Sequence, residues 1–331
     1  MALYLTESDV RSLLTMPLAI ELVETSFRRL AGGAATNHSR QRLLVPGKTV
    51  LNYMAASDAE SGYLGLKIYS IAKGSARFIV PLFSADSGDL VALIEADYLG
   101  QARTGAASGV ATKFMAREDA RSAAIVGTGS QARTQLEAIA CVRKLERVRA
   151  YSRDAQRRER FAKEMSERIG LAVTAVASAE EAVREADIVV TATTAAHPVV
   201  EGRWIAPGTH INAMGINVAH KSEIDAETVL RAGIVAADSP EQSRRESGDL
   251  IHAYGDDEAK WQKVRELSQV VVGKIPGRTS RDQITLFKSN GIAIEDVVTA
   301  GRIYEMAGQR GIGKEMPIWA SEGRQAEGRS V

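Results

Sequence analysis

The spacing of apolar residues changes character near residue 112. Before that point, apolar residues recur at helical spacing in residues 18–27, which predicts an amphipathic helix. Shorter apolar stretches separated by Gly, Pro, Asp and Ser follow and predict strands at 42–45, 50–54, 64–71, 78–84 and 90–95. Because the linkers are short, with a turn at 86–89, we expect an antiparallel sheet in this part of the chain.

Strand and helix patterns alternate after residue 121. Apolar runs are found at 122–126, 147–151, 188–193, 210–214 and 234–237. Such alternation predicts a parallel sheet with crossover helices. Two more apolar runs, 270–273 and 284–287, precede a long helix expected at 295–306. The sequence therefore predicts an α/β fold with a doubly wound parallel sheet and a second, α+β domain with an antiparallel sheet.

A chain of 331 residues is expected to form two domains. We place the first domain at residues 1–112 and expect a C-terminal helix at about 301–320 to complete it. The parallel sheet should occupy residues 113–300. The polar residues 321–331 are expected to form a flexible tail.

Charge and composition exclude several classes of function. The 42 Lys and Arg residues are balanced by 41 Asp and Glu residues, so no basic surplus is available for nucleic acid. No apolar run approaches the roughly 18–20 residues that span a bilayer, and the first residues lack a signal-peptide pattern. Cys141 is the one cysteine and is expected in the core, and the histidines show no ligand spacing, so no metal site is predicted. We expect a cytoplasmic protein that binds neither nucleic acid nor membrane.

A glycine-containing turn follows the apolar run 122–126. Gly127 permits a tight turn, Gly129 lets the backbone approach a pyrophosphate, and the small Ala132 allows close packing of helix on strand. Ser130 and Gln131 open the next helix, whose free amides favour an anion. This G-x-G-x-x-A turn between a strand and a helix predicts a Rossmann dinucleotide-binding domain at residues 113–300 and a nicotinamide cofactor.

The end of the second parallel strand distinguishes the two nicotinamide cofactors. An acidic residue there binds the ribose hydroxyl of NAD, whereas an arginine accommodates the 2′-phosphate of NADP. The sequence has Ser152 and Arg153 at this point and Arg157 one turn later, which favours NADP. Asp154 lies one or two positions late for the ribose contact, but loop geometry could bring it into play and restore NAD.

The chain resembles the ornithine cyclodeaminase/mu-crystallin family. The matching segments are 65–67, 82–88, 102–107, 127–132, 202–215, 237–239 and 287–291. The resemblance implies a Rossmann domain and a homodimer joined through the antiparallel sheets. It also implies that residues 1–112 form the substrate-binding and dimerisation domain.

The resemblance implies that Lys67 and Arg103 hold the α-carboxylate of the substrate, aided by Arg42 or Arg40. Cationic side chains suit this task, and a guanidinium can bind both carboxylate oxygens. Arg40 and Arg42 would share one face of an extended strand, so the pair could serve a dicarboxylate, or one of the two could be exposed. Asn290 is a further expected substrate contact.

Asp238 ends the apolar run 234–237 at the edge where open α/β sheets bind their ligands. The resemblance implies that Asp238 transfers a proton, which makes Asp238 and Lys67 the expected catalytic residues. The alternative is that Asp238 caps a helix beginning at Pro240. The cofactor contacts implied by the family, together with those of the turn and the second strand, are Ser75, Arg103, Thr104, Gly127, Gly129, Ser130, Gln131, Ser152, Arg153, Arg157, Thr193, Met214, Asp238 and Ser289.

The expected activity is NAD(P)H-dependent reduction of a small α-imino acid of the ketimine, Δ1-pyrroline-2-carboxylate or iminosuccinate type, reversible as an amino-acid dehydrogenase. One alternative is an ornithine cyclodeaminase that uses NAD catalytically. Asn52 and Gln242 replace a Glu and a Lys of the cyclodeaminases, and loss of that Glu disfavours ring closure. The other alternative is a mu-crystallin-like protein that binds a small ligand without turnover.

Overall fold

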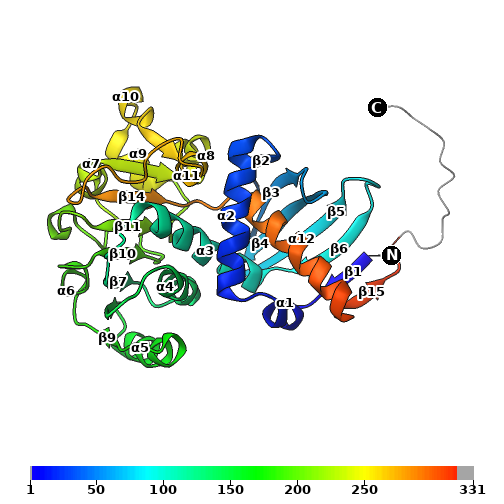
Figure 1. The fold of residues 1–331 in the computed structure, drawn as a ribbon, viewed down its shortest axis with the longest axis horizontal. Coiled ribbons are helices and arrows are strands. Elements are labelled where there is room, and N and C mark those ends of the chain that lie inside the picture. Colours follow the sequence, from blue (N-terminus) through cyan, green and yellow to red (C-terminus); the bar gives the residue numbers. More distant parts are fainter. Residues whose placement is uncertain (1, 319–331) are drawn as a thin grey trace.

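The computed structural model describes residues 2–318 and contains two β-sheets, which lie in different halves of the molecule (Figure 1). The predicted tail at 321–331 lies outside the described residues. The seven strands of the first sheet have the order β15-β1-β6-β5-β4-β3-β2. Their bounds are Ala2–Leu5 (β1), Ala35–Val45 (β2), Thr49–Asp58 (β3), Tyr63–Ala72 (β4), Ser75–Ser84 (β5), Leu90–Glu95 (β6) and Lys314–Met316 (β15).

Strands β2 to β6 pair in an antiparallel manner, which confirms the predicted sheet. β2 begins seven residues before the predicted strand at 42, because the segment 35–41 is polar and carries no alternating pattern. Its pairing with β3 shifts between His38 and Gln41. As a result, Arg40 is buried and Arg42 is exposed, although an undisturbed strand would turn both to one face.

The second sheet has eight strands in the order β13-β12-β14-β11-β10-β7-β8-β9, and every pair in it is parallel. The bounds are Ser122–Val126 (β7), Arg147–Tyr151 (β8), Val173–Ala175 (β9), Ile188–Thr191 (β10), His210–Ala213 (β11), Ile234–Ala237 (β12), Val264–Glu266 (β13) and Thr285–Lys288 (β14). The chain leaves β7 in one direction through β8 and in the other through β10. This reversal is the switch point of a Rossmann fold, where ligands bind.

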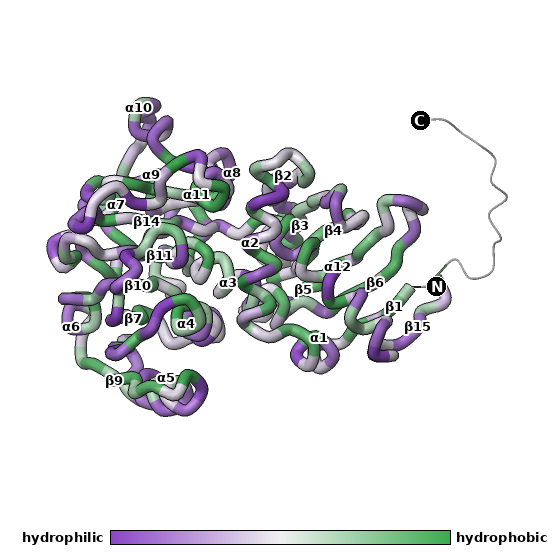
Figure 2. The backbone as a smooth tube through the Cα atoms, viewed as in Figure 1, coloured by the Kyte–Doolittle hydropathy of each residue, from purple (hydrophilic) through white to green (hydrophobic). Residues whose placement is uncertain are grey.

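Helices cover both sheets. Those of the parallel sheet are Ser130–Val142 (α4), Ala155–Ile169 (α5), Ala179–Val183 (α6), Ala226–Arg231 (α7), Pro240–Glu246 (α8), Gly248–Tyr254 (α9), Glu258–Trp261 (α10) and Leu267–Val271 (α11), with a 3-10 turn at Gly202–Trp204. The predicted apolar run 270–273 is therefore the end of α11 and a turn, whereas 284–287 forms β14. Figure 2 shows the expected contrast between the mostly hydrophilic α5 and the hydrophobic β6.

Helices α1 (Glu7–Leu13), α2 (Met16–Gly32), α3 (Asp97–Met115) and α12 (Ala293–Arg310) pack on or beside the first sheet. The helix expected at 301–320 is present only to Arg310, as the second half of α12, and the prediction was wrong beyond it: Gly311 and Gly313, both at positive φ, end the helix and β15 follows. Residues 319 and 320 lie outside the described residues. Residues 293–310 contact β3, β4 and α2. We therefore propose that the domain boundary lies near residue 292.

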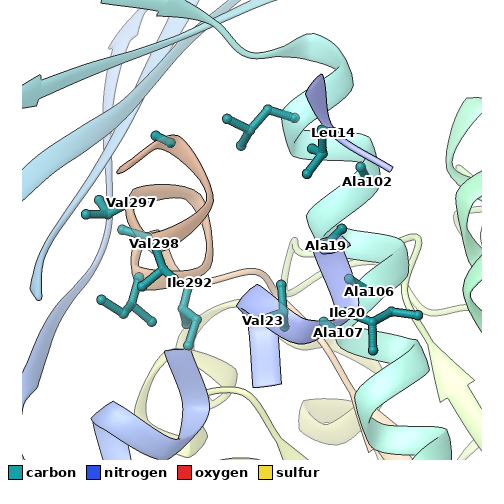
Figure 3. Packing of buried hydrophobic residues seen from close by; sticks show 14 of the residues in the cluster. Leu14, Ala19, Ile20, Val23, Ala102, Ala106, Ala107, Ile292, Val297 and Val298 are labelled. Atoms are coloured by element: carbon teal, nitrogen blue, oxygen red, sulfur yellow. The ribbon is translucent and has the colours of Figure 1, made fainter. Parts of the chain in front are cut away.

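The hydrophobic core between the two sheets is built on α3. Its Ala102, Ala106 and Ala107 are fully buried and face α2, and Figure 3 shows Ala19 and Val23 on that helix. The backbone of α3 also approaches α4, because a Cβ on Gly105 would lie 2.4 Å from the carbonyl oxygen of Thr134. These small residues bring α3 close to both domains and so place its polar side chains between them.

Cys141 is exposed on α4, so the expectation that it lies in the core was wrong. Its position near the end of the helix turns it outward, whereas Leu136 and Ile139 fill the core side. None of the helices within residues 2–318 is long and apolar enough to cross a membrane.

Candidate active site

Two cavities meet at the carboxyl ends of β7 and β10. The first has a volume of about 410 Å³ and lies between the two sheets. The second, about 670 Å³, extends along the end of β8. Both are lined by Gly129 and by residues 192–194, so they form one continuous groove. A groove of this kind can hold an extended ligand whose two ends lie against different domains.

The predicted dinucleotide turn lies at the junction of the two cavities. Gly127 has φ +109°, and a Cβ on it would lie 2.3 Å from the carbonyl oxygen of Ala192 on the neighbouring strand. A Cβ on Gly129, in contrast, would meet no atom of the described chain within 4 Å. α4 begins at Ser130 with no side-chain cap from the described residues, so its first amides are available to an anion. The turn therefore fits a dinucleotide pyrophosphate.

The second cavity is lined at its far end by Ser152, Arg153, Asp154 and Arg157. The Asp154 side chain caps α5 by accepting a hydrogen bond from the backbone N–H of Arg157 at 3.0 Å. It also pairs with the Arg157 side chain at 3.4 Å. Thr128 donates to Ser152 Oγ at 2.9 Å. The one carboxylate at this end of the groove is thus used by the helix start, and two arginines lie beside it.

The first cavity is also lined by Thr193, Met214 and Ser289, as well as by Thr104 and Gln131. A buried carboxylate that the sequence analysis did not single out holds this wall. Glu223 accepts hydrogen bonds from the backbone N–H groups of Thr193, at 2.6 Å, and Gly215, at 2.5 Å. Burial raises the pKa of Glu223. The two loops that follow β10 and β11 are therefore tied to one side chain.

Asp238 is fully buried at the end of β12. Its Oδ2 accepts from Ser289 Oγ at 2.8 Å and from the backbone N–H groups of Asn290, at 2.8 Å, and Gly291, at 2.6 Å. Its Oδ1 accepts from the backbone N–H of Ser239 at 2.8 Å. Asp238 thus lies behind the loop 289–291, whose residues line the cavity. The helix cap proposed as its alternative role belongs to Ser239 instead, which accepts from Gln242 N.

Lys67 on β4 and Arg103 on α3 come together in the first cavity. Lys67 Nζ donates to Asp296 Oδ1 at 2.7 Å, and Arg103 Nε donates to the same oxygen at 3.1 Å. Arg103 also donates to Glu295 Oε2 at 2.6 Å. Burial and the positive charge of Arg103 lower the pKa of Lys67 and Asp296 opposes them, with a net result of about 8. Two cations thus face the cavity and two carboxylates lie behind them.

Arg40 lines the first cavity, but its guanidinium is bound by protein groups. It pairs with Glu246 and donates to the carbonyl oxygens of Asn290, at 2.7 Å, and Gly291, at 3.3 Å. Arg42 lies outside the cavity, 3.4 Å from Glu246. The two arginines therefore share one carboxylate of α8.

Of the remaining residues expected to contact substrate or cofactor, some line the cavities and others do not. The Asn290 amide donates to Ser243 Oγ at 2.7 Å, and Asn290 lines the first cavity. Asn52 is buried and accepts from Arg42 Nε at 3.3 Å. Within residues 2–318, Ser75 and Arg42 line neither cavity. No group of three or more His, Cys, Asp and Glu side chains in this part of the chain could hold a metal ion.

Comparison with known proteins agrees with this geometry. Residues 2–311 match the family model described as ornithine cyclodeaminase/mu-crystallin. A Δ1-pyrroline-2-carboxylate reductase of Bacillus cereus is 33% identical over 95% of this chain and 99% of its own length.

Two solved structures extend this likeness. The Thermococcus litoralis Δ1-pyrroline-2-carboxylate reductase, in complex with NADH and L-proline, superimposes with a TM-score of 0.90 and 38% identity, covering 95% of this chain and 100% of that one. An archaeal alanine dehydrogenase dimer with bound NAD has a TM-score of 0.88 and 33% identity, covering 95% of this chain and 98% of that one. The chain belongs to the ornithine cyclodeaminase/mu-crystallin family and is an NAD(P)-dependent oxidoreductase that acts on CH–NH groups.

Proposed function

We propose that the protein reduces a small α-imino acid to the amino acid, with Δ1-pyrroline-2-carboxylate as the first candidate substrate. The observation that carries this proposal is the pair of buried cations, Lys67 and Arg103, in the same cavity that reaches the dinucleotide turn. The B. cereus relative bears the name of this activity, and the T. litoralis structure holds L-proline, its product.

The cations would bind and orient the substrate. Arg103 can hold both oxygens of a carboxylate through its planar guanidinium. Fixing the carboxylate places the neighbouring C=N carbon toward the cavity wall formed by Thr193, Met214 and Ser289. When bound at this wall, the reduced nicotinamide supplies the hydride. The protein contributes orientation, which lowers the barrier of a reaction between two bound groups.

Lys67 is the proton donor in this proposal. One of its three N–H groups is used by Asp296, and the other two are available to the substrate. A carboxylate oxygen and the imine nitrogen of an α-imino acid are separated by two carbons, so one ammonium can contact both. A pKa near 8 matches an acid that must act near neutral pH. The proton moves from Nζ to the imine nitrogen as the carbon receives the hydride.

Asp238 supports this reaction by holding neighbouring groups in place. Both of its oxygens already accept hydrogen bonds from residues 289–291 and Ser239. We propose that it holds the loop that forms one wall of the cavity and that its charge favours the positive form of nearby groups. This differs from the proton-transfer role expected for it from the family resemblance.

NADP is the proposed cofactor. Arg153 and Arg157 line the far end of the groove, where a 2′-phosphate would lie, and Asp154 is engaged by the start of α5. The relatives with bound cofactor hold NADH or NAD, so the preference for the phosphate rests on these two arginines alone.

A homodimer is the proposed assembly. Leu43, Leu44 and Val45 on the edge strand β2 are 58%, 65% and 53% exposed, and Ile71 on β4 is 43% exposed. An apolar surface beside a free strand edge favours association with a second copy. The archaeal alanine dehydrogenase is described as a dimer.

The test is oxidation of NADPH and NADH in the presence of Δ1-pyrroline-2-carboxylate, pyruvate with ammonia, and oxaloacetate with ammonia. We expect turnover with at least one imine, and a loss of at least about 100-fold in kcat/KM for Lys67→Met, since a positioned proton donor contributes about 10²- to 10⁴-fold. Lys163→Met, on the exposed face of α5, should retain activity. Oxidation of neither cofactor with any imine would show the proposal to be wrong.

The assay also distinguishes a cyclodeaminase. That activity would release ammonia from ornithine without a net change in nicotinamide absorbance. The buried Asn52 offers an amide where the cyclodeaminases have a carboxylate, and its oxygen already accepts from Arg42. We therefore expect no ornithine turnover.

A further inference from the structure

Lys67, Arg103, Glu295 and Asp296 form a buried group that we call the four-residue cluster. The side chains of Lys67 and Arg103 are 4% and 6% exposed, and those of the two carboxylates are fully buried. The cations line the cavity, whereas Glu295 and Asp296 lie behind them in the first turn of α12. The carboxylates can thus affect a ligand in the cavity only through Lys67 and Arg103.

The two carboxylates are not equivalent. Asp296 Oδ1 accepts from Lys67 Nζ and from Arg103 Nε, so it faces both cations. Glu295 accepts from Arg103 alone, through Oε2. Glu295 Oε1 and Asp296 Oδ2 are both buried without a hydrogen-bond partner among residues 2–318, so the difference between the two acids is that Asp296 faces two cations and Glu295 only one. A buried, ionised carboxylate oxygen without a partner is costly, whereas a protonated one removes that cost.

The charge of the cluster determines whether it can accept a carboxylate. If both acids are ionised, they balance Lys67 and Arg103, and a bound carboxylate adds an uncompensated negative charge to a buried site. If one acid is protonated, the cluster carries one positive charge and its complex with a carboxylate is neutral. The second state is the one suited to binding.

The surroundings indicate that Glu295 is the acid that carries the proton. Burial raises the pKa of Glu295, Arg103 on α3 lowers it, and Asp238 after β12 and the adjacent Asp296 raise it, with a net result of about 8. Lys67 on β4 donates to Asp296. A second carboxylate close to the first commonly has a raised pKa, because the two cannot both ionise without repulsion.

We propose that Glu295 is a positioning residue that is protonated when substrate binds, so that the four-residue cluster is positively charged and accepts the substrate carboxylate. The inference rests on the proposed role of Lys67 and Arg103 in binding that carboxylate. Glu295 acts through Arg103 and has no contact with the cavity. When Glu295 ionises, the cluster becomes neutral and its affinity for carboxylate falls.

The first test measures KM and kcat for Δ1-pyrroline-2-carboxylate between pH 6.5 and 9.5. Glu295→Gln keeps an oxygen that can accept from Arg103 but cannot ionise. The rise in KM from pH 7 to pH 9.5 should be at least about tenfold smaller in this variant, because ionisation above its pKa costs about tenfold in affinity per pH unit. The part of the rise that comes from Lys67 should remain. The control is Glu180→Gln, which alters an exposed ion pair with Arg184 and should keep the full rise.

An equal rise of KM in the wild type and in Glu295→Gln would overturn the inference. The inference would also be overturned if KM of Glu295→Gln differed from that of the wild type by the same factor at pH 7 and at pH 9.5. That result would show that Glu295 is ionised throughout this range. The pH profile of kcat should change little, since the proton donor is Lys67.

A second test needs no turnover. Infrared difference spectroscopy of the wild-type protein should show the C=O stretch of a protonated carboxyl that disappears with a midpoint near pH 8. Glu295→Gln should lack this change and Glu180→Gln should show it. Absence of the band in the wild type would overturn the inference. If no imine is reduced in the first assay, the proposed function fails, and the infrared titration still decides whether Glu295 is protonated.

Discussion

Gly291 donates its backbone N–H to Asp238 Oδ2 at 2.6 Å, and the carbonyl oxygen of the same residue accepts from Gln242 at 3.1 Å and from Arg40 at 3.3 Å. The loop 289–291 is thus held from behind by an anion on its N–H groups and from the other side by donors on its carbonyls. Gly291 has φ +79°, which allows the chain to turn between them. The loop 289–291, which forms one wall of the cavity, is therefore held in place by hydrogen bonds on both sides.

Asp238→Asn should reduce stability as well as activity. An amide offers one acceptor oxygen where the carboxylate offers two, so its NH₂ group would face the N–H of either Ser239 or the loop. Losing a charge-assisted hydrogen bond costs about 1.5–3 kcal/mol. We expect a lower midpoint of thermal unfolding together with lower kcat/KM.

The matched control is Asp257→Asn, which caps α10 outside both cavities, because Asn caps a helix about as well as Asp. It should change neither the unfolding midpoint nor the rate appreciably. If Asp238→Asn lowered kcat while the unfolding midpoint stayed unchanged, Asp238 would be a proton-transfer residue, contrary to the positioning role proposed above.

Replacing Arg153 and Arg157 together by Ser should raise KM for NADPH about tenfold or more and leave KM for NADH nearly unchanged, because only NADPH carries the phosphate that these guanidinium groups would bind. Steady-state kinetics with both cofactors at saturating imine would measure this. Arg160→Ser, farther along the exposed side of α5, is the control. An equal effect on both cofactors would refute the assigned preference.

Leu44→Glu should shift the protein from dimer to monomer. A charge at the edge strand β2, where Leu44 is 65% exposed in the single chain, would be buried without a partner in the proposed interface. Light scattering after gel filtration reports the molar mass. Leu230→Glu serves as the control, since Leu230 is 54% exposed on α7, away from the first sheet. A monomeric wild type would contradict the proposed assembly.

His210 should limit stability in acid. It is fully buried, and burial lowers its pKa from 6.5 to about 3. Below pH 6.5, His210 is protonated in the unfolded chain but stays neutral in the folded protein. The free energy of unfolding therefore falls as the pH drops toward 3. The expected loss is about 2 kcal/mol between pH 7 and pH 5.

Urea unfolding at the two pH values tests this. His210→Asn can keep the contact of Nδ1 with Thr285 Oγ1, 2.9 Å long, and cannot titrate, so it should lose about 2 kcal/mol less than the wild type over the same range. His38→Asn, at an exposed position, should behave like the wild type. An identical pH dependence in His210→Asn would assign the acid sensitivity to other groups.

Most local elements of this protein could be predicted from its sequence. Six of the eight parallel strands, the turn at Gly127 and Gly129 and the family were predicted, because hydrophobic period and glycine placement act over a few residues. The three-residue strands β9 and β13 were not predicted, because so short a run carries no period. Lys67 and Arg103 were also found, since a cation in an apolar run or a known motif stands out. The segment around Glu295 and Asp296 has a similar pattern, two acidic residues among apolar ones. These two residues were nevertheless not predicted as part of the site.

Which charges meet depends on the packing of distant parts of the chain. Lys67 and Asp296 are 229 positions apart, and Arg40 and Glu246 are 206 apart. The shift in the pairing of β2 buries Arg40 and exposes Arg42, which no periodic pattern could reveal. Burial and pairing depend on elements that are brought together by the packing of α3 between the two sheets and of α12 on the first sheet. The charge state of the site is therefore a property of the folded molecule, and no segment of the chain carries it alone.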